Sequence, residues 1–220
     1  MNTILITGFQ KFGHYRQNAT EVAIFDLYNI RSYHEGTPCS YQVDNLIFPV
    51  RIFSEATGYG RKIVKRAQEI NAKAIISLGM SSCVEGLRIE SLARNWVAKE
   101  KYCLSHEQKR VIDDRFDSKF SLEVDLKRWN FDQFFSKLSL ENISHEKQIS
   151  QNANSFCCNA LMFRTLQAIQ ETDCQIPYLF IHVPCTPHAV RGMPKNTRKN
   201  SMTSIPKIRK IISIISRCTS

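Results

Sequence analysis

The stretch "SEATGYGRKIVKRAQEINAKAIISLG", residues Ser54–Gly79, bears most directly on the fold. Its first part opens with a serine of the helix-capping type and continues with apolar residues at helical spacing, which predicts a helix over Ser54–Ile70. Its second part, "AKAIISLG" (Ala72–Gly79), is a short apolar run ending in glycine, as is typical of a buried strand. A helix followed directly by a buried strand indicates an α/β arrangement.

The same alternation continues on both sides of this stretch. Strands are predicted at Thr3–Phe9, Asn45–Val50, Arg88–Val97 and Tyr178–Pro184, and helices at Ala19–Ile30, Leu126–Leu138, from Asn154 or Ser155 to Ile169, and over Ser204–Arg217. We therefore expect an α/β fold, with an open, twisted, mixed or parallel sheet and helices on both faces. A length of 220 residues fits a single domain over 1–220.

The composition is that of an ordinary globular protein, with 43% hydrophobic and 23% charged residues. No run of 18 or more apolar residues is present, so we expect no membrane span. The first residues, "MNTILITGFQ", lack the basic region and cleavage site of a signal peptide. These features predict a cytoplasmic location.

The formal net charge is +10, and much of the excess lies near the C-terminus. A basic surface can attract nucleic acid or an acidic membrane. No basic motif interleaved with aromatic residues accompanies the charge, which favours a solvated face and no nucleic-acid partner. The residues concerned are Arg191, Lys195, Arg198, Lys199, Lys207, Arg209, Lys210 and Arg217.

The eight cysteines show no CxxC pair and no regular spacing. This pattern predicts neither a zinc site nor a disulfide framework, and most of these residues are expected to be reduced, buried thiols. We expect no metal and no cofactor.

Two neighbouring cysteines, Cys157 and Cys158, lie where a polar segment gives way to the predicted helix. The N-terminus of a helix favours a thiolate, and its free N–H groups can stabilise an oxyanion. The alternative is a pair of inert buried thiols. Helical periodicity does not separate the two residues, although one of them is expected to face the core.

Two further residues could complete a catalytic group. His182 lies near the carboxyl end of a predicted strand, one of three such ends, after Phe9, Gly79 and Val183, where ligands bind in sheets of this kind. Glu90 lies in a strand-like apolar run. A hydrogen-bonded core histidine and a solvent-facing glutamate are the alternatives. Together with a cysteine, they would supply nucleophile, base and orienting acid.

Several segments resemble, in the same order along the chain, those of the pyroglutamyl peptidase I family, also called pyrrolidone-carboxylate peptidases. In "NANSFCCNALMFRTL", the residues Ala153, Phe156, Cys158 and Asn159 fill places of the family motif Ala-Gly-x-Tyr-x-Cys-Asn. The other matching segments are "ILITGFQKFGHYRQNAT", "LGMSSCVEGLRIESLARN", "YLFIHVP" and "SMTSIPKIRKII".

The resemblance implies a cysteine exopeptidase that removes N-terminal pyroglutamate from peptides. It makes Cys158 the nucleophile, His182 the base and Glu90 the acid that orients the base, and it leaves Cys157 structural. It also implies a homo-oligomer with no metal or cofactor.

The resemblance further implies that Phe9 and Phe12 hold the pyrrolidone ring and that Asn18 lies at the same pocket. Ser91 stands where the family has an arginine, and Ser82-Cys83-Val84 stands where it has Gly-Gly-Arg. These departures favour, as an alternative, a divergent relative that hydrolyses another small blocked amide. The basic charge supports a second alternative, a binding protein with a vestigial site.

Overall fold

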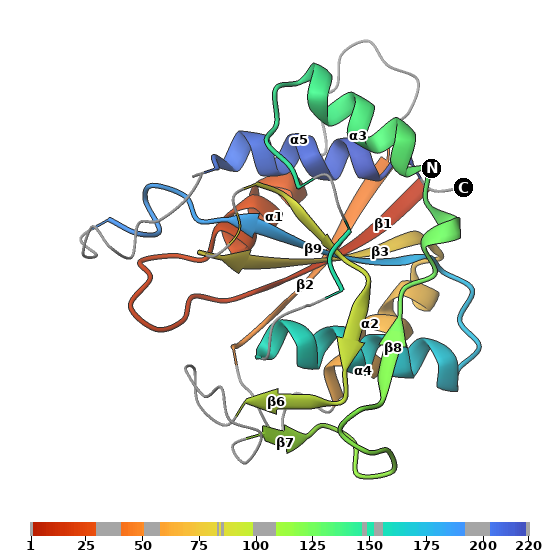
Figure 1. Ribbon diagram of the computed structural model, residues 1–220. Coiled ribbons are helices and arrows are strands. Elements are labelled where there is room, and N and C mark those ends of the chain that lie inside the picture. Colours follow the sequence, from red (N-terminus) through yellow and green to blue (C-terminus); the bar gives the residue numbers. More distant parts are fainter. Residues whose placement is uncertain are drawn as a thin grey trace.

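The computed structural model describes residues 2–29, 41–50, 58–82, 84, 86–98, 109–146, 149–151, 156–191 and 203–218. Its centre is a five-stranded sheet in the order β2-β1-β3-β9-β4 (Figure 1). These strands are β1 (Asn2–Phe9), β2 (Tyr41–Phe48), β3 (Ala72–Ser81), β4 (Arg88–Glu90) and β9 (Tyr178–Pro184).

Four of the five strands are parallel, and β4 alone runs antiparallel to its neighbour β9. The carboxyl ends of β1, β3 and β9 therefore meet at one edge of the sheet, where ligands of such sheets usually bind. Gly79 of β3 is paired with His182 of β9 at this edge.

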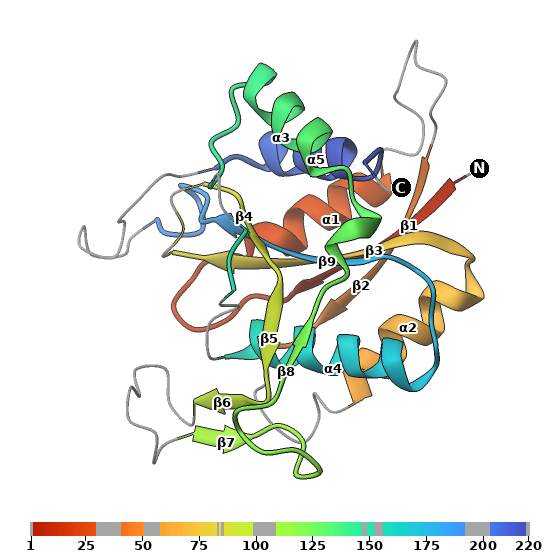
Figure 2. The same ribbon diagram turned by 45° about the vertical axis from the view of Figure 1, so that its right-hand side comes forward.

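Helices cover both faces of the sheet, as the two views show (Figure 1 and Figure 2). One face carries α1 (Ala19–Asn29) and α5 (Ile205–Ile215), and α3 (Phe131–Leu140) packs against α5. The other face carries α2 (Tyr59–Glu69) and α4 (Cys157–Glu171), which pack against each other. Because both faces are covered, β3 and β9 are buried along nearly their whole length. The α/β fold expected from the sequence is confirmed.

The C-terminal helix packs into the core through its isoleucines. Ser204 caps α5 by accepting a hydrogen bond from the backbone N–H of Lys207. The apolar stripe predicted from the sequence is fully buried, at Ile208, Ile211, Ile212 and Ile215. None of the described helices is long and apolar enough to cross a membrane.

The segment Arg88–Val97 differs from the single strand that the sequence predicts. It is divided into β4, β5 (Leu92–Arg94) and β6 (Trp96–Ala98). Whereas β4 pairs with β9, β5 pairs with β8 (Ser121–Glu123) and β6 with β7 (Lys109–Val111). The strand-like composition was thus correct, but its hydrogen-bonding partners change along the segment and break it.

Helix boundaries also differ from the prediction at two places. The predicted helix Leu126–Leu138 is a 3₁₀ turn, η3 (Leu126–Arg128), followed by α3, because Asn130 caps α3 by accepting a hydrogen bond from Gln133 N. Helix α2 begins at Tyr59, and the predicted capping Ser54 lies outside the described residues. Strand β2 covers Tyr41–Phe48, so it begins and ends earlier than the predicted strand Asn45–Val50, with which it overlaps.

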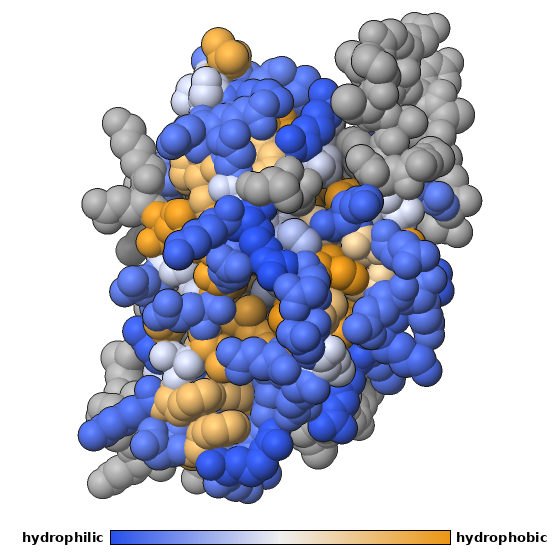
Figure 3. All heavy atoms as spheres, turned by 90° about the vertical axis from the view of Figure 1, so that its right-hand side faces the viewer, coloured by the Kyte–Doolittle hydropathy of each residue, from blue (hydrophilic) through white to orange (hydrophobic). Residues whose placement is uncertain are grey.

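The surface is mainly hydrophilic on the face drawn in Figure 3, and apolar side chains show between polar ones in separate patches. Among the described residues, the exposed large hydrophobic side chains are Phe25, Phe116 and Leu140.

Candidate active site

His182 and Glu90 form a buried pair at the carboxyl edge of the sheet. The Nδ1 atom of His182 lies 2.7 Å from Oε1 of Glu90, and neither side chain is exposed. The antiparallel pairing of β4 with β9 sets Glu90 opposite Phe180 and Arg88 opposite His182. Glu90 is thus a diagonal neighbour of His182 on the same face of the sheet. The solvent-facing alternative for Glu90 is wrong.

This pairing decides which nitrogen of the imidazole can act as a base. A carboxylate that accepts a hydrogen bond from Nδ1–H holds the ring in one orientation and leaves Nε2 with its lone pair. The Nε2 atom of His182 is buried and has no hydrogen-bond partner among the described residues. It is therefore free to accept a proton from a neighbouring group.

The sulfur of Cys158 lies beside the same imidazole. A Cβ atom added to Gly79 would lie 3.0 Å from Cys158 Sγ and 3.0 Å from His182 Nε2, so these two atoms are separated by no more than twice that distance. Gly79 is directly paired with His182. The absence of a side chain at Gly79 therefore leaves the space in which the thiol and the imidazole approach each other.

The two cysteines of α4 have different surroundings. Cys157 is buried, and burial raises the pKa of its thiol to about 11. Cys158 is half-buried, and the pKa of its thiol is raised above its usual value, first by burial and then by the neighbouring Cys157 and Glu90. Burial thus outweighs the helix N-terminus, and the resting Cys158 is a neutral thiol that needs a base to ionise.

The model of the pyroglutamyl peptidase family matches residues 2–216 of this sequence. The chain belongs to this family. Its members are cysteine peptidases, so this chain is a cysteine peptidase as well.

Individual relatives are distant in sequence but similar over nearly the whole chain. A pyrrolidone-carboxylate peptidase of Bacillus cereus is 25% identical over 97% of this chain and 91% of its own length. One of Clostridium perfringens is 27% identical over 93% and 88%. The solved structure of pyrrolidone carboxyl peptidase from Thermococcus litoralis superposes with a TM-score of 0.74 at 21% identity, covering 99% of this chain and 92% of that one.

The predicted ring-holding residues lie at the same edge of the sheet as Gly79. The β1–β3 pairing extends to Thr7 with Ser77, and Phe9, which pairs with Phe48 of β2, is the last residue of β1. Phe9 is 3% exposed. Phe12 is partly buried, and its ring centroid lies 5.0 Å from that of Tyr15.

Asn18 is buried and holds the loop between β1 and α1 in place. Its Oδ1 accepts hydrogen bonds from the backbone N–H of Thr20 at 3.0 Å and from the Thr20 hydroxyl at 2.9 Å. Its Nδ2 donates to the carbonyl of Gln10 at 3.2 Å. Asn18 therefore caps α1 and shapes the loop that carries Phe12.

The places of the family arginines are filled differently here. Ser91 is buried, and its hydroxyl donates a hydrogen bond to the carbonyl of Ser150 at 3.1 Å. Arg88 lies opposite His182, but its Nε donates to Oε2 of Glu146 at 2.8 Å. Val84 is buried in the place of the second arginine.

Asn159 is a site residue whose structural role the sequence did not reveal. It is 1% exposed, accepts a hydrogen bond from Arg94 N at 2.8 Å, and donates to the carbonyls of Arg94 at 2.9 Å and Trp96 at 2.8 Å. These bonds fasten the start of α4 to the strands that follow Glu90. An asparagine next to Cys158, inside an otherwise apolar helix face, was the available signal.

The N-terminal turn of α4 carries backbone N–H groups next to Cys158. Phe156 occupies the N-cap position without a side-chain cap, whereas the predicted caps Asn154 and Ser155 lie outside the described residues. The first N–H groups of a helix have no partner within it, so they can serve as hydrogen-bond donors. Within the described ranges, no group of three or more His, Cys, Asp or Glu side chains could hold a metal ion.

Proposed function

We propose that this peptidase removes N-terminal pyroglutamyl residues from peptides, with Cys158 as nucleophile, His182 as base and Glu90 as the acid that orients the imidazole. One arrangement carries the proposal. Cys158 Sγ and His182 Nε2 both lie next to Gly79, and Glu90 is hydrogen-bonded to the other nitrogen of the imidazole. The membership of the chain in the pyroglutamyl peptidase family supports the choice of substrate.

Acylation begins with the transfer of the Cys158 proton to Nε2 of His182. The sulfur then attacks the carbonyl carbon of the pyroglutamyl residue, and the carbonyl oxygen becomes an oxyanion. Backbone N–H groups in the first turn of α4 can donate to that oxygen. The C–N bond then breaks, and the imidazolium gives its proton to the departing amine. Glu90 stabilises the imidazolium throughout because it is a carboxylate within hydrogen-bond distance.

Deacylation repeats the same steps with water. His182 takes a proton from water, and the oxygen attacks the thioester carbon. The C–S bond breaks, the sulfur regains its proton from the imidazolium, and free pyroglutamate leaves.

The substrate preference follows from the chemistry of pyroglutamate, a small uncharged lactam. The aromatic residues Phe9 and Phe12, near Gly79 or on the adjoining loop, can contact a flat ring. A free α-amine would have to be desolvated in such a site without a partner, which is costly. A peptide with a blocked N-terminus is therefore favoured over one with a free amine.

Release of the fluorophore from pyroglutamyl-aminomethylcoumarin tests the proposal. We expect turnover that is abolished by a thiol alkylator and by Cys158→Ala. A Cys158→Ala protein that kept wild-type turnover would refute the assignment of the nucleophile. If all thiols were alkylated at similar rates and no turnover occurred, the site would be vestigial.

A second candidate is the hydrolysis of another small blocked amide. It is favoured by Ser91, which stands in place of the family arginine and makes a hydrogen bond to Ser150 instead. A panel of blocked aminomethylcoumarin amides distinguishes the two candidates. Turnover of a different blocked amide, with none of the pyroglutamyl compound, would favour the second.

Assembly into a homo-oligomer and a cytoplasmic location stay predictions from the sequence. Light scattering coupled to size-exclusion chromatography would test the first, and localisation of a tagged chain would test the second.

A further inference from the structure

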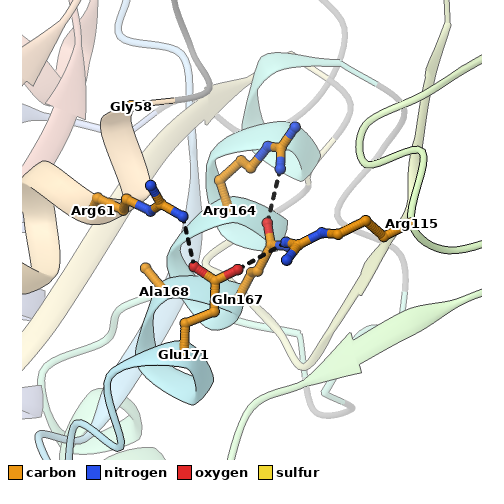
Figure 4. Close-up of a pocket in the computed structure, with 7 residues that line it drawn as sticks. All are labelled: Gly58, Arg61, Arg115, Arg164, Gln167, Ala168 and Glu171. Carbon is orange, nitrogen blue, oxygen red and sulfur yellow. Dashed lines mark hydrogen bonds and ion pairs between the residues drawn. The ribbon is translucent and has the colours of Figure 1, made fainter.

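A pocket separate from the proposed active site lies on the outer side of α4. It has a volume of about 240 Å³ and is bounded by α2, α4 and the loop around Arg115 (Figure 4). Because an α-helix rises about 1.5 Å per residue, Arg164 lies roughly 9 Å along α4 from Cys158. The lining residues are Gly58, Arg61, Arg115, Arg164, Gln167, Ala168 and Glu171.

Positive charge exceeds negative charge at this pocket. Three arginines line it, whereas the carboxylates in contact with them are those of Glu171 and Asp113. In Figure 4, Glu171 lies between two of the arginines. Its Oε2 accepts from Arg61 at 3.1 Å and its Oε1 from Arg115 at 2.8 Å. Both oxygens of this carboxylate are therefore already occupied.

Asp113 is also fully engaged behind the pocket. Its Oδ2 lies 2.7 Å from Nη2 of Arg115 and 3.3 Å from Nη1 of Arg164, and it also accepts a hydrogen bond from Gln167. The backbone N–H of Arg115 donates to Oδ1 at 3.0 Å. The two carboxylates together therefore balance the charge of two of the three guanidinium groups.

Two of the arginines keep donors for a ligand. A guanidinium has five N–H groups. Arg61 uses only Nη2 toward described residues, and Arg115 uses Nε and Nη2, so Nη1 of each is unoccupied by them. Their side chains are 75% and 60% exposed, so both guanidinium groups are accessible from solvent.

The wider surroundings add to the positive potential. Helix α2 begins next to the pocket, with Gly58 at its N-cap and no acidic residue in its first turn. The positive end of its dipole therefore lies beside the pocket, which Glu171 also lines. The pKa of Arg164 is lowered, mainly by burial; the charges of Asp113 and Glu171 oppose this shift, and those of Arg115 and Arg61 add to it.

We propose that this pocket binds a phosphate oxyanion. Guanidinium groups match the oxygens of phosphate with paired N–H donors, and three of them line this pocket, where two carboxylates of the described residues pair with them. The volume of about 240 Å³ is many times the roughly 10–15 Å³ that one water molecule needs by the same measure, so a phosphate ester also fits. The site does not depend on the peptidase activity.

The alternative is a purely structural cluster, in which the ion pairs only fasten α2 and the Arg115 loop to α4. Such a cluster would bind no anion beyond the weak attraction of any basic surface. The phosphate affinities of two variants distinguish these alternatives. One variant loses a charge inside the pocket, and the other loses a charge outside it.

Titration calorimetry at fixed ionic strength tests the proposal. The probes are inorganic phosphate and glycerol 3-phosphate, and glycerol is the neutral control. Arg61→Gln removes a charge from the pocket, and Lys65→Gln removes one from the same helix, where Lys65 is 80% exposed and outside the pocket lining. We expect binding by wild type and Lys65→Gln, with affinity at least tenfold lower in Arg61→Gln.

The two probes identify the source of the phosphate. Tighter binding of glycerol 3-phosphate assigns the pocket to an ester, and tighter binding of inorganic phosphate assigns it to the free ion. No binding of either probe to wild type, or equal weakening in both variants, would overturn the proposal. A second variant, Arg115→Lys, keeps the charge but loses the paired donors, and its affinity is also expected to fall.

Discussion

The Nδ1 atom of His182 lies 2.7 Å from Oε1 of Glu90, and both side chains are completely buried. The two residues come from β9 and β4, which are antiparallel neighbours, whereas the other strand pairs described in the main sheet are parallel. A buried carboxylate costs free energy unless it is hydrogen-bonded, so this pair is a constraint on the fold as well as a device for orienting the imidazole.

Replacement of Glu90 by glutamine tests that orientation. We expect the turnover of pyroglutamyl-aminomethylcoumarin to fall by about 10² to 10⁴, because the amide no longer holds the imidazole in the right tautomer or stabilises its positive form. Glu146→Gln is the control, since Glu146 pairs with Arg88 and is 31% exposed. Equal turnover in wild type and Glu90→Gln would contradict the role of Glu90.

The two neighbouring cysteines should respond differently to alanine. Cys158→Ala removes the sulfur beside His182 and is expected to lower turnover at least 10³-fold, since no nucleophile is left. Cys157→Ala is expected to keep turnover within several-fold, because its thiol is buried. Initial rates with matched protein concentrations are the measurement. Similar losses in both variants would leave the assignment to Cys158 without support.

Asn159→Ala should reduce both stability and turnover. It removes three hydrogen bonds to the backbone of Arg94 and Trp96, and we expect the free energy of unfolding to fall by about 3 kcal/mol. Because the bonds position α4, kcat should fall at least tenfold with little change in KM. Asn130→Ala, which removes the cap of α3, should cost about 1 kcal/mol without changing kcat. An unchanged kcat in Asn159→Ala would show a merely structural residue.

Gly79→Ala should block the approach of thiol and imidazole. The added Cβ would lie 2.9 Å from Cδ2 of His182 and 3.0 Å from Cys158 Sγ, so one of the two side chains must move. We expect loss of turnover and a free energy of unfolding lower by about 1–3 kcal/mol. Gly58→Ala is the matched control, because no atom lies within 4 Å of its added Cβ. Full turnover in Gly79→Ala would mean that the two groups do not meet there.

Stability should fall at alkaline pH. Burial raises the pKa of Cys157 from 9.0 to about 11, so the folded protein holds this proton more tightly than the unfolded chain. The resulting stability is fully present below pH 9.0 and is lost as the pH rises toward about 11. A shift of this size corresponds to about 2–3 kcal/mol.

Urea unfolding at pH 8 and pH 11 measures this effect. Tyr178, Cys158 and Cys218 also have raised pKa values and act in the same direction, so the comparison is between wild type and Cys157→Ala. The variant should lose less stability between the two pH values. An equal loss would contradict the role of Cys157.

Most elements of the fold could be predicted from the sequence. The apolar run of β9 and the alternating faces of α5 are local patterns, and their predicted bounds agree with the structure to within two residues. The failures occurred where distant partners decide the structure. Arg88–Val97 has strand composition throughout. It is nevertheless divided, because β5 pairs with β8 and β6 pairs with β7 outside the main sheet.

In the candidate site as well, local sequence patterns predicted some features and contacts between distant residues decided others. The sequence by itself determined the α/β order of elements and singled out Cys158, His182 and Glu90 as the residues of the proposed triad, because periodicity and motif are properties of neighbouring residues. Only the tertiary structure decided that Glu90 is buried rather than exposed, and that the Cys158 sulfur and the His182 imidazole both lie next to Gly79. Those outcomes depend on strand register and on the packing of α4, which join residues far apart in the chain.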